Sequence, residues 1–309
     1  MHPKSFLQNI IRLLLLFIGF NIIGSIVTFI LLRSLFNVDA LSVLKSINDA
    51  NVDSGTINAL KFMQFIQVFF SFVIPAHLFA RSHSFHNTID YLRLHPTKWK
   101  HFLLGALFII IVSPLVSYTS ILNEQISLPS FLSNVEQYFR NQQLQSEKFA
   151  TMFLRDNTGK DLVINIFIVG LLAAVSEELF FRGVLQNILS EKINNIHIVV
   201  ITCSILFSAL HQEFYALIPR TLLGMALGYA YFFSKSLWVP MLMHFVNNTT
   251  AVVLDSLYKQ GYSSFNPNTN EYFGSIGLII SLIATIALFW YWNKHRMPSV
   301  VIIYGERLD

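Results

Sequence analysis

Long apolar runs, separated by polar connectors, recur along almost the whole chain. A helix needs about 20 mostly apolar residues to cross the hydrocarbon core of a bilayer. These runs lack the alternation of every second residue that marks the strands of a membrane barrel. We therefore predict an all-α fold, a polytopic membrane bundle of about eight transmembrane helices, over residues 9–32, 60–81, 101–122, 162–188, 196–214, 217–233, 237–256 and 274–293.

The whole chain, 1–309, is expected to be a single integral membrane domain, with a motif-bearing core at about residues 162–256. Basic residues in short connectors mark the cytoplasmic side of a membrane protein. Here they fall on one side of the predicted bundle, which places both termini in the cytoplasm. These residues are Lys4, Arg81, Arg93, Lys98, Lys100, Lys192, Lys235, Lys294 and Arg296. We expect the membrane to be the cytoplasmic membrane of a bacterium.

Two longer polar connectors, about 34–58 and 123–161, are predicted on the opposite side. The second connector contains apolar residues at helical spacing, which predicts short interfacial helices. We interpret them as a surface cover rather than a substrate gate. The residues are Phe131, Val135, Tyr138 and Phe139, followed by Phe149, Met152 and Phe153.

The composition agrees with a membrane protein. Hydrophobic residues make up 54% of the chain and charged residues only 12%, whereas a soluble domain averages about 25% charged residues. The formal net charge of +4 is spread between apolar segments, so membrane lipid is an expected partner and nucleic acid is not. The single cysteine, Cys203, excludes an intramolecular disulfide framework and a cysteine-based zinc cluster.

The stretch AVSEELFFRGVL places Glu177, Glu178 and Arg182 inside one of the apolar runs. A charged side chain at the centre of a spanning helix costs on the order of 3 kcal/mol, so all three are expected to face the protein interior. Glu178 and Arg182 are four residues apart and share a helical face, whereas Glu177 is rotated by about 100° from Glu178. Arg182 can therefore pair with Glu178 and leave Glu177 free, although an ion pair that only fixes helix packing remains an alternative.

Two further polar intrusions lie on later apolar runs: Phe207 with His211, and His244 with Asn248. Each pair is four residues apart and shares a helical face. Alone, an intramembrane histidine is more often a hydrogen-bonding partner between helices than a catalyst. Together with a free glutamate, two imidazoles could bind a catalytic zinc ion or activate a water and stabilise an oxyanion. Both chemistries lead to hydrolysis.

The ordered set EExxxR, FxxxH and HxxxN resembles the CPBP family of intramembrane proteases. This family includes type II CAAX prenyl endopeptidases and bacterial proteins linked to bacteriocin processing or self-immunity. The motifs cover only about residues 170–250. The resemblance implies an endopeptidase that cleaves a membrane-associated or C-terminally processed substrate. A prenylated tail, a leader peptide and a membrane protein are all open as substrates.

Carried over to this chain, the resemblance implies that Glu177 and His211 activate the attacking water. His244 and Asn248 would stabilise the oxyanion, and Glu178 and Arg182 would shape the site. One tension accompanies these roles, because a rise of about 1.5 Å per residue puts His244, Glu177 and His211 at depths of about 10, 16 and 22 Å below the cytoplasmic boundary.

The family has been interpreted both as zinc-dependent and as a group of metal-free glutamate proteases. If a metal is used, Glu177, His211 and His244 are its candidate ligands. Asn248 suits an oxyanion hole better than a zinc shell. We therefore favour a mechanism without an obligatory metal and keep zinc as the alternative cofactor.

Two other functions remain open. Intramembrane carboxylates and histidines also form relays in ion-coupled transporters, which would show discontinuous helices and an internal repeat. No repeat is evident, and the spacing of Gly224 and Gly228 is explained equally well by a close contact between helices. The second alternative is a non-catalytic immunity or scaffold protein, although every motif position is present.

Remaining histidines and aromatic residues are interpreted as non-catalytic. A histidine cluster around the connector after the second run is expected to meet water or lipid head groups: His83, His86, His95 and His101. An aromatic and basic belt is expected at the end of the last helix, formed by Trp290, Tyr291 and Trp292 with Lys294 and Arg296.

Overall fold

The computed structural model describes residues 5–39, 43, 52–83, 87–264 and 274–298. Helices account for all regular structure in these residues, and no strand occurs among them. The predicted all-α fold is therefore confirmed. Lys4 and His86 lie outside the described residues, as do residues 40–42 and 44–51 of the connector at 34–58.

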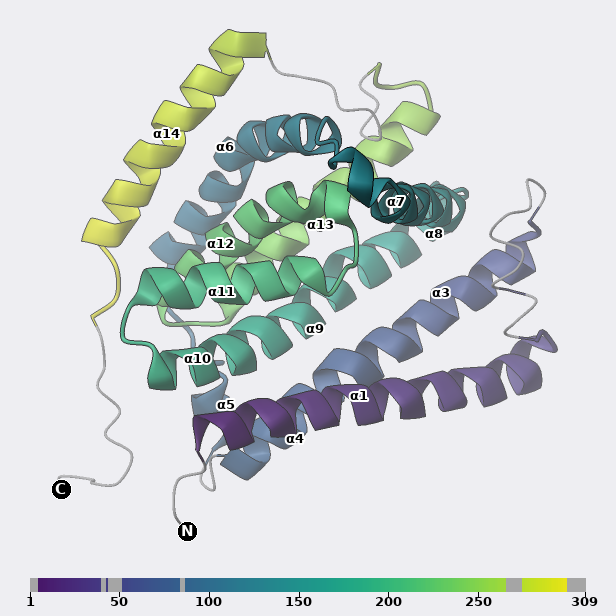
Figure 1. The fold of residues 1–309 in the computed structure, drawn as a ribbon, viewed down its shortest axis with the longest axis horizontal. Coiled ribbons are helices and arrows are strands. Elements are labelled where there is room, and N and C mark those ends of the chain that lie inside the picture. Colours follow the sequence, from purple (N-terminus) through teal and green to yellow (C-terminus); the bar gives the residue numbers. More distant parts are fainter. Residues whose placement is uncertain (1–4, 40–42, 44–51, 84–86, 265–273, 299–309) are drawn as a thin grey trace.

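Six helical segments are long and apolar enough to cross a membrane (Figure 1). They are α1 with its π-helical extension η1 (Phe6–Leu31 and Leu32–Phe36), the α3, η3 and α4 segment (Ser54–Val68, Phe69–Val73 and Ile74–His83), α6 (Trp99–Glu124), the Gly159–Lys192 segment, η7 with α12 (Phe214–Ala216 and Leu217–Ser234) and α14 (Gly274–Lys294). The chain is thus a polytopic membrane protein.

The other two predicted segments are also helical but differ from the six. The helix α11, Ile196–Ala209, is apolar but has only 14 residues, so the run predicted to continue to residue 214 ends five residues earlier. Asn195 caps its start by accepting a hydrogen bond from the backbone of His197. The seventh of the eight, α13, Trp238–Lys259, has 22 residues and carries the polar HxxxN motif.

The Gly159–Lys192 segment is one helical rod with two π-helical interruptions. It comprises α8 (Gly159–Asn165), η5 (Ile166–Leu172), α9 (Ala173–Phe180), η6 (Phe181–Leu185) and α10 (Gln186–Lys192). π-Helical turns are rare and often occur at functional sites. Here they lie on both sides of α9, which carries the two glutamates.

Aromatic side chains pack α9 against the first two spans. Phe180 lies with its ring centroid 5.4 Å from that of Phe17 on α1 and 5.5 Å from that of Phe72 in η3. Rings at such distances add to the stabilisation that their burial provides. This packing fixes the motif-bearing rod between the N-terminal spans on one side and α11 to α13 on the other.

Two glycines on α12 bring it close to α11. A Cβ atom at Gly224 would lie 2.9 Å from Cβ of Ser204, and one at Gly228 would lie 2.9 Å from a methyl group of Val200. Only glycine permits this approach of the two helices. The spacing of four between Gly224 and Gly228 therefore serves a close contact between helices. This was one of the two explanations that the sequence left open, the other being a transporter helix.

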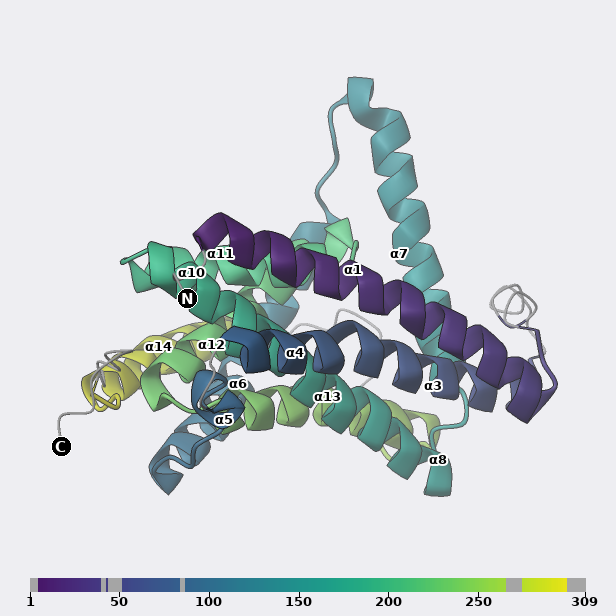
Figure 2. The ribbon, with the colours of Figure 1, turned by 90° about the horizontal axis from the view of Figure 1, so that it is seen from below.

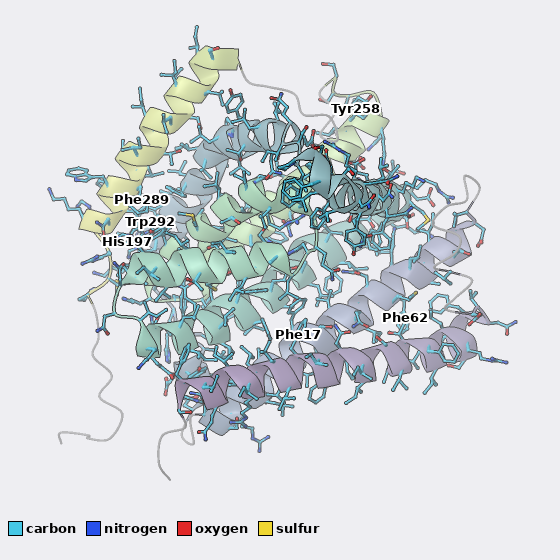
Figure 3. All side chains as sticks on the ribbon, in the orientation of Figure 1. Phe17, Phe62, His197, Tyr258, Phe289 and Trp292 are labelled. Atoms are coloured by element: carbon cyan, nitrogen blue, oxygen red, sulfur yellow. The ribbon has the colours of Figure 1, made fainter. Side chains whose placement is uncertain are left out.

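The last helix packs on the bundle through Trp292. Its indole Nε1 donates a hydrogen bond of 2.9 Å to Nδ1 of His101 on α6, and both side chains are buried. Phe289 lies one turn earlier on the same side of α14 (Figure 3). Trp292 therefore does not belong to the predicted belt, whereas Trp290 and Tyr291 are exposed. The prediction of a solvated His101 was wrong for the same reason.

A long helix, α7 (Ser133–Phe153), extends sideways from the bundle in the connector at 123–161 (Figure 2). The helical spacing of its apolar residues is confirmed, but they form one helix of 21 residues instead of several short ones. Met152 and Phe153 at its end are buried, whereas Val135 and Tyr138 near its start are exposed.

Basic connectors meet at one end of the bundle. A short helix, α5 (Thr88–Tyr91), begins the connector that runs to α6. The backbone N–H of Leu237 donates to the carbonyl of Arg93, and that of Met297 donates to Phe233. The connectors after α5, α12 and α14 are thus joined where the N-terminus of α1 and the described end of the chain also lie (Figure 1).

Candidate active site

The two adjacent glutamates of α9 have different surroundings. Glu178 is fully buried, whereas the side chain of Glu177 is 14% exposed. Successive residues on a helix are rotated by about 100°, so only one of the two can share a face with Arg182. The structure contains the predicted ion pair: Arg182 Nη1 lies 2.7 Å from Glu178 Oε1, and both side chains are fully buried.

Arg182 also links α9 and η6 to the neighbouring helices. Its Nη2 donates a hydrogen bond of 2.8 Å to the carbonyl of Gly224 on α12. Its guanidinium carbon lies 4.9 Å from the ring centroid of Phe207 on α11, a favourable cation–π distance. One buried cation therefore holds a carboxylate, a backbone carbonyl and an aromatic face together.

Glu178 accepts a second hydrogen bond at the same oxygen. Nδ1 of His244, on α13, lies 2.9 Å from Glu178 Oε1. A carboxylate accepts in this contact, so Nδ1 of His244 carries the proton and Nε2 is left for other partners. Glu178 thus fixes the orientation of His244, a role that its spacing from Arg182 did not predict.

The second glutamate faces the other nitrogen of the same imidazole. Glu177 Oε2 lies 3.8 Å from His244 Nε2, which is longer than a hydrogen bond. The two groups therefore border a common space without bonding to each other. Arg182 forms its ion pair with Glu178 and none with Glu177, in agreement with the pairing predicted from the sequence.

His211 lies in a turn after α11, outside both neighbouring helices. Its backbone N–H donates to Ser208, and the next residue, Gln212, has a φ of +58°. Nδ1 of His211 lies 2.9 Å from the carbonyl of Phe207. Because a carbonyl can only accept, the proton sits on Nδ1, and Nε2 of the neutral ring has a free lone pair.

Burial holds the pKa of His211 below its usual value. The nearby carboxylate of Glu177 acts in the opposite direction, as does Glu213, while the charge of Arg220 lowers the pKa further. Burial outweighs the carboxylates, so the neutral imidazole is favoured. Glu177 is therefore close enough to His211 for their charges to interact.

Phe207 contacts both imidazoles. Its ring centroid lies 5.1 Å from that of His211 and 6.0 Å from that of His244, in both cases in an edge-to-face arrangement. The FxxxH motif thus describes an aromatic spacer between the two histidines, with Arg182 over the same ring. The FxxxH motif indicated that Phe207 is important, but the sequence could not show which side chains it contacts.

Asn248 lies one turn after His244 on α13. Its Nδ2 donates a hydrogen bond of 3.0 Å to the carbonyl of Val169 in η5. The next residue in η5, Gly170, is in close contact with α13, since a Cβ there would lie 2.6 Å from Oγ1 of Thr249. One amide N–H of Asn248 is used in this contact and the second is left for a ligand.

The structure therefore brings Glu177, Glu178, Arg182 and His244 into one cluster, with His211 beside it across Phe207. The depths derived from segment lengths did not coincide, whereas the structure places Glu177, His244 and His211 around one space.

A metal site would need three or more ligands at suitable positions. Within the part of the chain that the structure describes, no such group of His, Cys, Asp or Glu side chains is present. Glu177, His211 and His244 in this arrangement do not fit a three-ligand site, so we derive the chemistry below from the side chains alone.

The motif-bearing segment matches known proteins. Residues 159–250 match the family model described as "Type II CAAX prenyl endopeptidase Rce1-like". Two curated proteins of Bacillus subtilis (strain 168) are similar: "Putative membrane peptidase YdiL", 28% identical over 89 residues, and "Uncharacterized protein YpbD", 35% identical over 91 residues. These matches cover 29% and 28% of this chain, and 36% and 43% of the respective relatives.

The chain therefore matches less than half the length of either curated relative. No solved structure matches it. The family model begins at the start of α8 and ends within α13, and it contains all seven motif residues. The resemblance drawn from the motifs is thus confirmed for residues 159–250, which match the model of the Rce1-like type II CAAX prenyl endopeptidases.

Proposed function

We propose that this protein is an intramembrane endopeptidase that hydrolyses a peptide bond in a membrane-associated or C-terminally processed substrate. The observation that carries the proposal is the carboxylate of Glu177, which lies beside His244 and His211 without a hydrogen bond to either, while Oε1 of the neighbouring Glu178 is held by both Arg182 and His244. Carboxylate and imidazole groups with free lone pairs are what general base catalysis requires.

In the proposed reaction, a water donates one hydrogen bond to Glu177 and another to Nε2 of His211. The water oxygen adds to the scissile carbonyl carbon, and its proton passes to Glu177. The same proton is then transferred to the leaving nitrogen as the C–N bond breaks. Glu177 therefore ends the cycle ionised. The new carboxylic acid still holds the second proton of the water and gives it to the new amine, so the products carry a carboxylate and an ammonium group.

His244 and Asn248 are proposed to stabilise the oxyanion. Nε2 of His244 would have to carry a proton for this role, since Nδ1 already donates to Glu178. Asn248 would contribute its second amide N–H, the first being donated to Val169. Fixed donors that meet the developing charge lower the barrier because they need no reorganisation during the reaction.

A groove beside His211 supports a membrane-associated substrate. It encloses about 430 Å³ between α1, the α3 and η3 segment, and Leu210 and Gln212 on either side of His211. Its lining mixes apolar residues with uncharged polar ones: Phe17, Ile18, Asn21, Ile22, Gln64, Gln67, Val68, Ser71 and Phe72. The amide and hydroxyl groups of this groove can form hydrogen bonds with a peptide backbone, and its apolar residues can contact substrate side chains or an isoprenoid.

The cytoplasmic membrane of a bacterium is the proposed location, with both termini in the cytoplasm. The basic connectors gathered at the end of the bundle that holds both described chain ends support this orientation. The identity of the substrate, with or without a prenyl group, is left to experiment.

The experiment is a comparison of peptide termini in the membrane proteome of cells carrying the native protein or Glu177→Gln. We expect a set of new N-termini that depends on the native protein and disappears in the variant, because the general base is lost. Exposed Glu124, at the end of α6, provides a matched control: Glu124→Gln should leave the set intact.

The non-catalytic alternative makes the opposite prediction. A scaffold or immunity protein would produce no difference in peptide termini between the native chain and Glu177→Gln, and the variant would retain its partner. That result, obtained with correctly inserted protein, would overturn the proposed hydrolysis.

A further inference from the structure

Three cations lie over aromatic rings at the basic end of the bundle. The guanidinium carbon of Arg93 is 5.2 Å from the ring centroid of Tyr231 on α12. Lys235 Nζ and the guanidinium carbon of Arg296 lie 4.2 and 5.4 Å from the ring centroid of the adjacent Phe232. Three elements that are far apart in sequence thus bring their positive charges to the last turn of one helix.

A cavity of about 250 Å³ opens beside two of these cations, between α10, the start of α11 and the end of α12. Arg93 and Lys235 line it together with hydrogen-bonding side chains and several apolar ones. The remaining lining residues are Gln186, Asn187, Ser190, Ile193, Asn194, Ile196, Val199, Tyr231 and Phe232.

Hydrogen bonds fix the side chains and backbone that line this cavity. Asn187 donates to the carbonyl of Tyr91 at 3.0 Å and accepts from the hydroxyl of Tyr231 at 3.0 Å. The carbonyl of Arg93 accepts from the backbone of Leu237 at 2.9 Å. Arg93 and Lys235 are held at φ values of +52° and +55°, which favour glycine or asparagine over long side chains.

The positive charge in the cavity has no counter-charge among the described residues. Neither Arg93 nor Lys235 forms an ion pair there; the nearby acids Asp90 and Glu191 pair with His95 and His83. Burial lowers the pKa of Lys235 to about 8, and the charges of Arg93 and Arg296 act in the same direction. An anion in the cavity would offset both the desolvation and the mutual repulsion.

We propose that this cavity binds a phosphate group, carried by the head group of an anionic phospholipid. Arginine and lysine side chains with adjacent amide and hydroxyl donors are the chemistry that recognises phosphate. Basic pockets between transmembrane helices commonly hold anionic head groups. Ile193 and Ile196 on the cavity wall, and the lipid-facing Ile198 on α11, give the attached acyl chains an apolar surface.

This inference does not rest on the proposed peptidase activity. It requires only that the basic end of the bundle lies at a membrane interface. A structural role for the bound lipid follows, since it would neutralise the junction of the connectors after α5, α12 and α14.

The test measures binding of phosphatidylglycerol to the full-length protein in nanodiscs, with phosphatidylcholine as the neutral comparison. The variants are Lys235→Asn and Arg93→Asn, because asparagine tolerates the left-handed backbone and removes the charge. We expect each to weaken the preference for phosphatidylglycerol by about fivefold and to leave the fold intact. Lys294→Gln, which removes an equal charge over Trp290 on α14, should have no effect.

Two results would count against the proposal. Equal preference for phosphatidylglycerol in the native protein and in both asparagine variants would overturn the site. A third arm adds inorganic phosphate to protein in phosphatidylcholine nanodiscs and follows thermal unfolding. If inorganic phosphate stabilises the native protein at the concentration that suffices for the lipid, and Lys235→Asn abolishes this stabilisation, the cavity is a phosphate site. The same result would overturn a lipid as the source of the phosphate.

Discussion

His244 and Glu178 are joined by a hydrogen bond of 2.9 Å between Nδ1 and Oε1, although 66 residues separate them in the chain. The same oxygen accepts from Arg182, so one carboxylate orients the imidazole and neutralises the guanidinium. Adjacent glutamates therefore have separate tasks: Glu178 organises the cluster, and Glu177 is available for the reaction.

This division predicts different outcomes for the same substitution at adjacent positions. Glu178→Gln removes the counter-charge of a fully buried arginine, so the free energy of unfolding should fall by about 3–5 kcal/mol. Glu177→Gln should leave stability within about 0.5 kcal/mol and reduce peptide cleavage by about 10²–10⁴-fold. Denaturant unfolding in detergent and a cleavage assay measure the two effects.

A double variant controls for the loss of charge. Glu178→Gln combined with Arg182→Met removes both buried charges, so it should be less destabilised than the sum of the single changes. Additive losses would show that the two side chains are not coupled, contrary to their 2.7 Å contact.

Gly170 is predicted to be essential for the contact between η5 and α13. Gly170→Ala would place a Cβ 2.6 Å from Thr249 Oγ1 and should destabilise the protein by about 1–3 kcal/mol, as overpacking does. It should also displace Asn248 from Val169 and so lower kcat. The thermal midpoint and kcat are the measurements, and Thr249→Ala in the same chain should restore both, because it removes the clashing oxygen.

The lowered pKa of His211 predicts the acid limb of the pH profile. A histidine acts as a base only when neutral, and burial keeps this one neutral to a lower pH than the usual 6.5. As pH falls, activity should therefore persist through 6.5 and decline only when His211 is protonated. A profile of kcat/KM against pH, with its midpoint at or above 6.5, would contradict this assignment.

Substitutions at Arg220 and Glu213 test the direction in which the pKa of His211 is shifted. They form an ion pair of 2.7 Å, and their charges act on His211 in opposite directions. Arg220→Gln should move the acid limb to higher pH, because it removes a positive charge that favours the neutral ring. Glu213→Gln breaks the same ion pair but should move the limb to lower pH. A purely structural effect of losing the pair would give the same change in both variants.

Metal removal is predicted to leave cleavage intact. The described residues contain no three-ligand group of the metal-binding type, and the proposed chemistry uses side chains alone. Activity should therefore survive exhaustive chelation with the fold preserved, as followed by thermal unfolding. Loss of activity that zinc restores would assign Glu177, His211 and His244 to a metal instead.

Several features followed from the sequence because they depend on local geometry. Apolar run lengths predicted the helices, and the spacing of four between Glu178 and Arg182 predicted their ion pair. The order of the three motifs was specific enough to indicate the family that the comparison confirmed for residues 159–250.

Tertiary structure decided which of these side chains meet. Helical periodicity gives the face a residue occupies but not the partner across from that face, so the contact of His244 with Glu178 could not be derived. It depends on how closely the helices approach one another, as at Gly170, where only a glycine leaves room for Thr249 of α13. Trp292 turned inward for a similar reason, since its partner His101 lies 191 residues away.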